Sequence, residues 1–185
     1  MAAKDEICWF PMRVTYHREM KIKSLLDESS IENFIPMQYV MVDTKNEGKK
    51  RVLQPAIHNL VFVRSTQETL THLKMTQRGF DPMRYMMKRP VDSTQAPEIM
   101  TIPDEQMNNF MRVASVQDDR VIFLNYEELR NNIGKRVRVM GGYFAGVEGV
   151  IKRINRNKRV LVQLEGLAAV AIAFVPTSQL SLINT

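Results

Sequence analysis

The chain has 185 residues, a net charge of +6, a single Cys and 44% hydrophobic residues, a composition typical of globular proteins with one or two domains. No apolar run approaches the roughly 18 to 20 residues that a membrane span needs, and the N-terminal sequence lacks the pattern of a secretory signal. Because a single Cys cannot form an internal disulfide, we expect Cys8 to be a small hydrophobe in a reducing cytoplasm.

The charge is unevenly distributed along the chain. Residues 1–132 hold 18 basic and 18 acidic residues, whereas residues 133–185 hold eight basic and two acidic residues and so account for the whole surplus. This asymmetry predicts a second module with its own partner, which is either a nucleic acid or an acidic protein surface.

The first half is predicted to mix strands and helices. Residues 7–14 form an apolar strand, and Pro11 places that strand at a sheet edge or interrupts it. Apolar residues with helical spacing predict a helix over residues 16–29, with polar residues on another face. The apolar positions are Ile22, Leu25 and Leu26, and the polar positions are His17, Lys21, Ser24 and Glu28.

Further elements follow in an order typical of a split βαβ unit. Strands are predicted at 34–42, 51–55, 59–63 and 83–87, with a hairpin tip at 43–50, and helices at 66–76 and from Asp104 onward.

Beyond residue 113 the helical patterns end. Residues 114–132 have few apolar residues and are predicted to be a linker, although Val121–Tyr126 could pair locally. The remainder contains five short strand-like segments, with a turn at Asn155–Lys158, and predicts a small β-barrel.

The most specific pattern lies between Gly134 and Ile151. A strand runs into two adjacent glycines and an aromatic pair, and two further glycines precede a second strand, as a tight barrel corner requires. This pattern resembles a KOW motif, and its surroundings resemble the SH3-like barrel that carries it. The motif positions are Val137, Val139, Gly142, Phe144, Gly146 and Gly149.

With that motif in place, the first half resembles the NGN domain of the NusG family. The matching stretches are Cys8-Trp9-Phe10, Phe34-Ile-Pro-Met37, Asn59-Leu-Val-Phe-Val63, Arg78-Gly79 and Ile102–Phe110, in the family's order and spacing. The resemblance implies an α+β fold with an NGN domain over 5–113, a linker over 114–132 and a KOW domain over 133–185. It also implies a transcription elongation or antitermination factor that binds RNA polymerase.

The resemblance assigns residues to two polymerase contacts. An apolar patch would include Trp9, Ile57, Leu60, Phe62, Met107, Phe110 and Met111, and the gate-loop contact would include Thr69, Thr71 and His72. The alternative for each apolar residue is ordinary domain core, above all for Trp9 and Phe62. The 13 Met residues have the same two interpretations, an adaptable binding surface or core filling.

The chain departs from the general NusG pattern at one turn. General members have Pro-Gly-Tyr where this chain has Ile57-His58-Asn59-Leu60. Specialised paralogues of the RfaH type tolerate such changes and act at chosen operons, and some read the non-template DNA strand. The matching DNA-binding positions are Thr15, Tyr16, His17, Lys21 and Arg78, for which a solvated helix face is the alternative.

The KOW domain would bind a small ribosomal protein or the termination factor Rho. Four basic residues near one predicted turn, Arg153, Arg156, Lys158 and Arg159, form a candidate face for RNA or an acidic partner, although a merely solubilising turn explains them equally well. A general NusG-type factor and a ribosomal-type KOW protein that binds RNA remain alternatives. The β-branched alternation predicts that this domain rests as a barrel, not as a helical hairpin.

Nothing in the sequence predicts an enzyme or a cofactor. The residues His17, His58, His72 and Cys8 are scattered over different elements without metal-ligand spacing, and the glycines form no phosphate-binding loop. We therefore expect a monomeric binding protein without a metal and without membrane contact.

Overall fold

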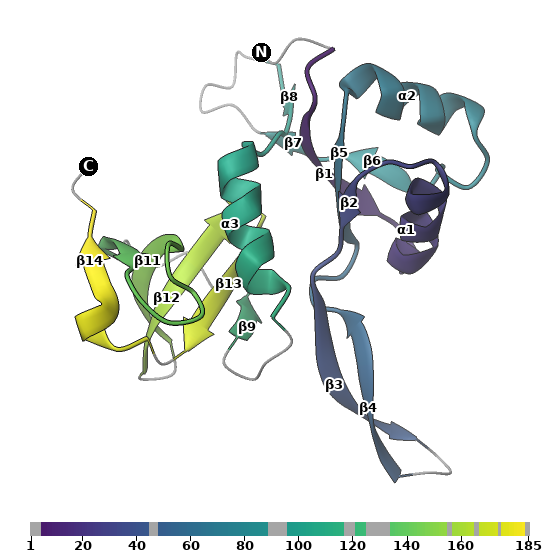
Figure 1. Cartoon of the computed structure of the whole chain (residues 1–185). Helices are drawn as coiled ribbons and strands as arrows, with labels where there is room; N and C mark the ends of the chain where they lie inside the picture. Colours follow the sequence, from purple (N-terminus) through teal and green to yellow (C-terminus); the bar gives the residue numbers. More distant parts are fainter. Residues whose placement is uncertain are drawn as a thin grey trace. The chain divides into compact units, whose positions relative to one another are not determined.

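The computed structural model describes residues 5–44, 48–88, 96–116, 121–124, 134–154, 157–164, 167–173 and 175–183. The chain divides into two compact units (Figure 1). The first unit comprises Met1–Ile35 and His58–Asp104, and the second comprises Pro36–Ile57 and Glu105–Thr185. Within the described ranges, no helix combines the length and apolar character that crossing a membrane requires.

The first unit contains an antiparallel sheet with the strand order β2-β5-β1-β6. Helix α1 (Glu19–Glu28) contacts β2 and β5, and helix α2 (Gln67–Thr76) connects β5 to β6. This succession of elements confirms the split βαβ order. The strands are β1 (Cys8–Val14), β2 (Asn33–Phe34), β5 (Leu60–Ser65) and β6 (Met83–Tyr85).

Strands β1 and β5 supply much of the core of this unit. All four residues of the run Leu60–Val63 are buried, as expected for a strand that is covered on both faces. Trp9, Phe10, Met12 and Val14 of β1 are buried too, and each large apolar side chain removed from water contributes about 1.5–3 kcal/mol.

Pro11 does not place β1 at an edge, because β1 lies between β5 and β6. Its ladder to β6 covers only Met12–Val14 and so begins directly after the proline, while Pro11 itself lies opposite Phe62 of β5. The missing N–H of proline is therefore accommodated where the second ladder ends. The prediction of an edge strand was wrong. The predicted interruption is found in the pairing of β1 with β6, whereas the pairing with β5 continues through Pro11.

Helix α1 begins three residues later than the sequence predicts. Tyr16 and His17 have φ values of 64° and 50°, which a right-handed helix does not allow, so His17 lies in a turn and not on the helix. The predicted apolar side is correct, since Ile22 and Leu26 are buried. Helix α2 begins as predicted, with Thr66 Oγ1 accepting a hydrogen bond of 3.1 Å from the Thr69 amide.

Two short hairpins accompany these elements. In the second unit, β3 (Met37–Thr44) pairs with β4 (Gly48–Pro55) from Met37↔Pro55 to Thr44↔Gly48, and residues 45–47 of the predicted tip lie outside the described residues. In the first unit, β7 (Met87–Lys88) pairs with β8 (Glu98–Ile99). The strand predicted over 83–87 is thus divided between β6 and β7.

The second unit also contains a sheet with the strand order β14-β10-β11-β12-β13-β9. Helix α3 (Asp104–Ala114) belongs to this unit as well, except for its first residue, Asp104, which is part of the first unit. All strand pairs of this sheet are antiparallel. The strands are β9 (Val121–Leu124), β10 (Arg136–Val139), β11 (Glu148–Ile154), β12 (Asn157–Leu164), β13 (Ala168–Ala173) and β14 (Leu180–Leu182), and a 3₁₀ turn spans Thr177–Gln179.

Strand β9 lies within the stretch that the sequence predicts as a linker. It pairs with β13 from Leu124↔Ala169 to Val121↔Ile172, and Leu124 packs with Leu161 of β12, accompanied by Ile122. The predicted linker therefore contains a strand of the second sheet. The α+β fold class is confirmed, because the described residues of each unit combine helix with an antiparallel sheet.

Candidate functional site

The KOW positions occupy the β10–β11 region of the second sheet. Val137 and Val139 are buried on β10, and Phe144 is buried in the turn that follows. Gly142 and Gly146 have φ values of 78° and 86°, a region that L side chains rarely adopt. Two of the predicted glycines are therefore required by backbone conformation.

Gly149 is required for a different reason. It lies opposite Val137 in the β10–β11 ladder, and a Cβ atom added there would lie 2.5 Å from the carbonyl oxygen of Leu161 on β12. No side chain fits at that distance. The close approach of β11 and β12 thus explains the final glycine of the motif.

The predicted basic face of the KOW half is only partly described. The backbones of Arg153 and Lys158 lie opposite each other across β11 and β12, while their side chains and the whole of Arg156 lie outside the described residues. The Nε and Nη1 atoms of Arg159 are buried, with no hydrogen-bond partner in the part of the chain that the structure describes. Arg159 as a whole is half-buried, so two of its three guanidinium nitrogens present no surface to the expected partner.

The seven residues predicted to hold polymerase do not form one exposed patch. Trp9, Leu60, Phe62, Met107 and Phe110 are buried, and only Ile57 and Met111 are partly exposed. The domain-core interpretation therefore holds for these five side chains, because a buried side chain presents no surface to a partner.

An exposed apolar surface lies instead on the β3–β4 hairpin, which the sequence analysis did not consider as a site. Its apolar side chains lie beside the exposed cations Lys49, Lys50 and Arg51, and the Arg51 guanidinium lies 4.2 Å from the centroid of the Tyr39 ring. The signal that could have revealed it is that β3 carries apolar residues on both of its faces, Tyr39 and Met41 on one and Val42 on the other. The exposed apolar residues are Tyr39, Met41, Val42, Val52 and Leu53.

The three gate-loop residues all lie on α2. Thr69 and His72 are exposed, whereas Thr71 is half-buried, with its hydroxyl 3.0 Å from the Tyr85 hydroxyl. The Tyr85 ring also carries the Lys74 ammonium 4.4 Å from its centroid. Burial is the main cause that lowers the pKa of Lys74 and raises the pKa of Tyr85.

The five predicted DNA-binding residues come from neighbouring parts of the first unit. Tyr16 is 79% exposed in the turn between β1 and α1, and His17, Lys21 and Arg78 are exposed as well, whereas Thr15 is half-buried. The Thr15 amide donates to the Pro82 carbonyl (3.2 Å), so this turn contacts the segment that follows Arg78.

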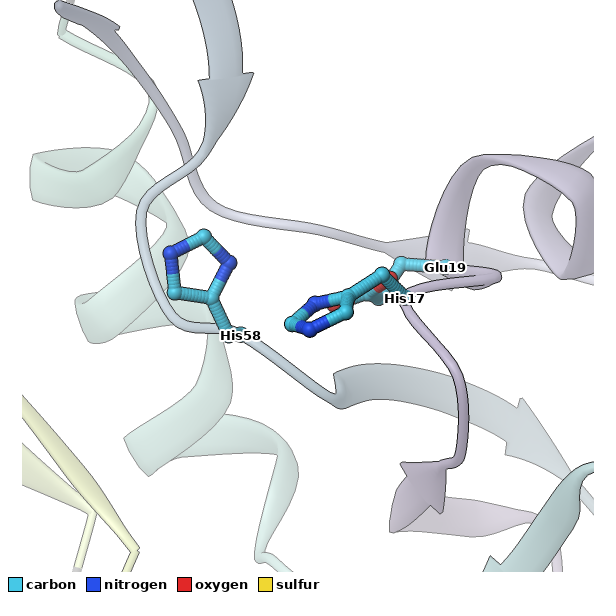
Figure 2. Close-up of side chains that lie close together, drawn as sticks. All are labelled: His17, Glu19 and His58. Atoms are coloured by element: carbon cyan, nitrogen blue, oxygen red, sulfur yellow. The ribbon is translucent and has the colours of Figure 1, made fainter.

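The fold also brings together two histidines that the sequence analysis considered scattered. His17 from the β1–α1 turn and His58 from the turn before β5 lie beside Glu19, the first residue of α1 (Figure 2). Their donor atoms all lie within 4.8 Å of one another, and the two rings meet edge to face at 5.7 Å. The expectation of scattered ligands was therefore wrong for this pair, because local spacing cannot reveal two distant turns that meet.

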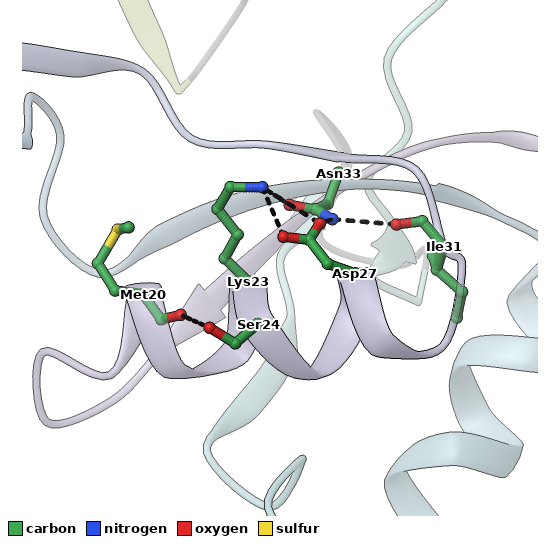
Figure 3. Close-up of polar contacts among 6 residues, drawn as sticks. All are labelled: Met20, Lys23, Ser24, Asp27, Ile31 and Asn33. Carbon is green, nitrogen blue, oxygen red and sulfur yellow. Dashed lines mark hydrogen bonds and ion pairs between the residues drawn. The ribbon is translucent and has the colours of Figure 1, made fainter.

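The far end of α1 is held by a polar cluster (Figure 3). The Asn33 side-chain amide donates to Asp27 Oδ1 (2.7 Å) and to the Ile31 carbonyl (3.0 Å), and the Lys23 ammonium donates to Asp27. The Asn33 bond, followed by the Lys23 bond, lowers the pKa of the Asp27 carboxyl. These contacts fix the helix that carries Lys21 and Glu19.

Comparisons with known proteins match both halves of the chain. A family model described as "Transcription termination factor nusG" matches residues 7–111, and a KOW motif model matches residues 133–164. No curated protein matches the chain. A solved structure described as "Domain interaction in Thermotoga maritima NusG" has 17% sequence identity and a TM-score of 0.45, with 98% of this chain and 100% of that chain covered.

The first family model covers more than half of the chain, and the second matches the segment that holds β10, β11 and β12. The chain therefore belongs to the NusG family of transcription elongation and antitermination factors, which bind RNA polymerase.

Proposed function

We propose that this protein is a specialised NusG-family factor, similar to the RfaH type, that promotes processive and antiterminated transcription at chosen operons such as polysaccharide clusters. The observation that carries the proposal is the turn Ile57-His58-Asn59-Leu60, which replaces the Pro-Gly-Tyr of general members. The alternatives are a general factor that acts on most genes and a ribosomal-type protein that binds RNA through its KOW half.

Operon choice would come from contact with the exposed non-template DNA strand. Tyr16, with its largely exposed ring, suits base stacking, and Lys21 and Arg78 suit phosphate contacts. The guanidinium of Arg18 lies 5.7 Å from the Tyr16 ring centroid and adds a further cation to the same turn. An exposed aromatic ring among cations supports single-strand binding better than it supports a merely solvated surface.

Polymerase would be held by apolar contact, because residues 1–132 carry no net charge. Ile57 and Met111 remain available from the predicted patch, and the apolar side chains of the β3–β4 hairpin extend the surface that a partner could cover. On α2, Thr69 and His72 are exposed for a gate-loop contact. The KOW half would recruit a small ribosomal protein or Rho.

Occupancy across the genome tests the proposal. We expect the wild-type protein, mapped on chromosomal DNA by crosslinking, to be confined to a few operons, because its recruitment needs a particular exposed DNA strand. Tyr16→Ala should lose this enrichment, since stacking contributes about 1–3 kcal/mol per base. Tyr143→Ala, which removes an exposed Tyr from the KOW half, is the matched control.

Uniform occupancy of most transcribed genes by the wild-type protein would identify a general factor. Association with ribosomes in place of polymerase would support the ribosomal-type alternative. Equal loss of enrichment in the Tyr16 and Tyr143 variants would argue against strand reading by the β1–α1 turn.

A further inference from the structure

The cluster of His17, Glu19 and His58 has the donor set of a transition-metal site. Two imidazole nitrogens and one carboxylate oxygen lie within 4.8 Å of one another, and all three residues belong to the first unit (Figure 2). Such N and O donors are the usual zinc ligands, whereas Mg²⁺ and Ca²⁺ prefer oxygen alone.

Glu19 is the most informative member of the cluster. Its side chain is buried, with 2% of the residue exposed, and its Oε1 accepts one hydrogen bond, from the Asn59 amide at 2.5 Å. Within the described ranges Glu19 forms no ion pair. A buried carboxylate needs a compensating positive charge, and a cation between the three donors would supply it.

The backbone around the cluster holds it in a defined shape. Tyr16, His17 and Asn59 have φ values of 64°, 50° and 61°, and they are three of the four non-glycine residues with positive φ in the described part of the chain. Such conformations persist where the surroundings determine them, and they gather at ligand sites. Here they flank Glu19 and His58, so the unusual backbone lies on both sides of the cluster.

From these observations we propose that His17, Glu19 and His58 bind one Zn²⁺ ion. Ligand bonds of about 2.0–2.2 Å in tetrahedral geometry separate the donors by about 3.3–3.6 Å. Both histidines are exposed, so small rotations of their side chains close the remaining gap while the buried carboxylate stays in place. The Asn59 amide acts from outside the ligand set, because its hydrogen bond orients Glu19.

The ion would join the β1–α1 turn to the turn before β5. Three protein ligands leave the fourth position to water, which the exposure of both histidines allows. The site depends on the first unit alone and does not rest on the proposed role in transcription.

Titration of the metal-free full-length protein with ZnCl₂ in a calorimeter tests the proposal. We expect saturable binding of one Zn²⁺ per chain, a higher melting temperature with Zn²⁺ and no response to MgCl₂. His17→Ala and His58→Ala should each weaken binding at least about tenfold, as should Glu19→Gln, which keeps an acceptor for the Asn59 amide.

His72→Ala is the matched control, because His72 is an exposed histidine on α2 outside the cluster. It should bind Zn²⁺ as the wild type does. Cys8→Ser should do so too, and this variant removes the free thiol, which could itself bind Zn²⁺ in place of the cluster. Far-UV circular dichroism should show that all variants are folded. Absence of saturable binding, several weak sites, or equal loss in His72→Ala would overturn the proposal, and so would unchanged binding in both His17→Ala and His58→Ala.

Discussion

Residues of one chemical type have different roles in this chain, and the surroundings of each residue decide which. Gly142 and Gly146 permit positive φ values, whereas Gly149 leaves room for the neighbouring strand. Gly141 in the same motif has space, because a Cβ atom there would meet its nearest neighbour, the Gln179 side chain, at 3.6 Å. Glycine pattern alone does not separate these cases, although it locates the motif.

Gly149→Ala should therefore destabilise the protein strongly. The new Cβ would lie 2.5 Å from the Leu161 carbonyl oxygen, and relief requires movement of the β11–β12 backbone. We expect a loss of about 1–3 kcal/mol in the free energy of unfolding, as for overpacking in a core. Urea denaturation monitored by circular dichroism measures the loss. Gly141→Ala is the control, and an equal loss in both variants would contradict the steric explanation.

Residue type alone does not decide the role of an apolar residue either. Trp9 and Phe62 are apolar and aromatic, as both a core and a binding patch require, and only their burial distinguishes the two roles. Tyr16 shows the opposite outcome, since a positive φ removes it from the predicted helix and leaves its ring in solvent. The residue type at a position thus predicts which roles are open to it, and burial and backbone conformation decide between them.

At the scale of elements, cores were predicted more accurately than boundaries. The apolar stripe of α1 identifies its buried side correctly, because helical spacing and burial are linked directly. The start of α1 and the place of β1 in its sheet were mispredicted, because a turn and a partner strand determine them. Local sequence carries little information on either.

One ionic cluster links several elements of the first unit. The Arg64 guanidinium on β5 contacts both carboxylate oxygens of Asp104, with Nη2–Oδ2 at 2.9 Å and Nε–Oδ1 at 3.3 Å, and lies 3.5 Å from Glu32. The hydrogen bond from Arg64 is the main cause that lowers the pKa of Asp104. The side chains are partly exposed, so screening by solvent keeps the effect small.

The Arg64–Asp104 contact predicts a definite pH dependence. A lowered folded-state pKa makes the stabilisation complete above the unfolded value of about 3.9, and it is lost as pH falls through the folded value. The urea midpoint of the wild type should exceed that of Asp104→Asn by a constant amount from about pH 7 to 5, and the difference should shrink below about pH 4. High salt should reduce the difference at every pH.

Asp5→Asn is the control for this titration, because Asp5 is exposed and forms no ion pair within the described part of the chain. A difference between wild type and Asp104→Asn that grows toward acid would have the wrong sign and would exclude the proposed linkage.

At the scale of the whole molecule, the KOW-bearing sheet begins earlier in the chain than its sequence motif does. Strand β9 supplies the buried side chains of Val121 and Leu124, and it covers an edge of β13 that would otherwise be unpaired. The sequence left open that residues 121–126 pair locally, and the structure shows that Val121–Leu124 pair with β13.

We therefore expect a fragment of residues 117–185 to be more stable than a fragment of residues 134–185. The shorter fragment lacks the buried side chains of Val121 and Leu124, so its free energy of unfolding should be lower by about 3–6 kcal/mol, at about 1.5–3 kcal/mol for each side chain. Thermal unfolding followed by far-UV circular dichroism compares the two, and Leu124→Ala in the longer fragment should reproduce much of the loss. Leu182→Ala, at an exposed position on β14, is the control. Equal stability of both fragments, or a strongly helical spectrum, would contradict this architecture.

The sequence by itself determined the order of the elements, the buried side of α1, the KOW motif and the family. Each of these features depends on the spacing of residues within one segment, and the sequence alone gives that spacing. Only the tertiary structure decided that β1 is an inner strand, that β9 joins the second sheet, and that Trp9 and Phe62 are core. It also brought His17 and His58 together beside Glu19. The physical reason is common to all of these outcomes, since burial and proximity arise from contacts between segments that are distant in sequence, which no local pattern encodes.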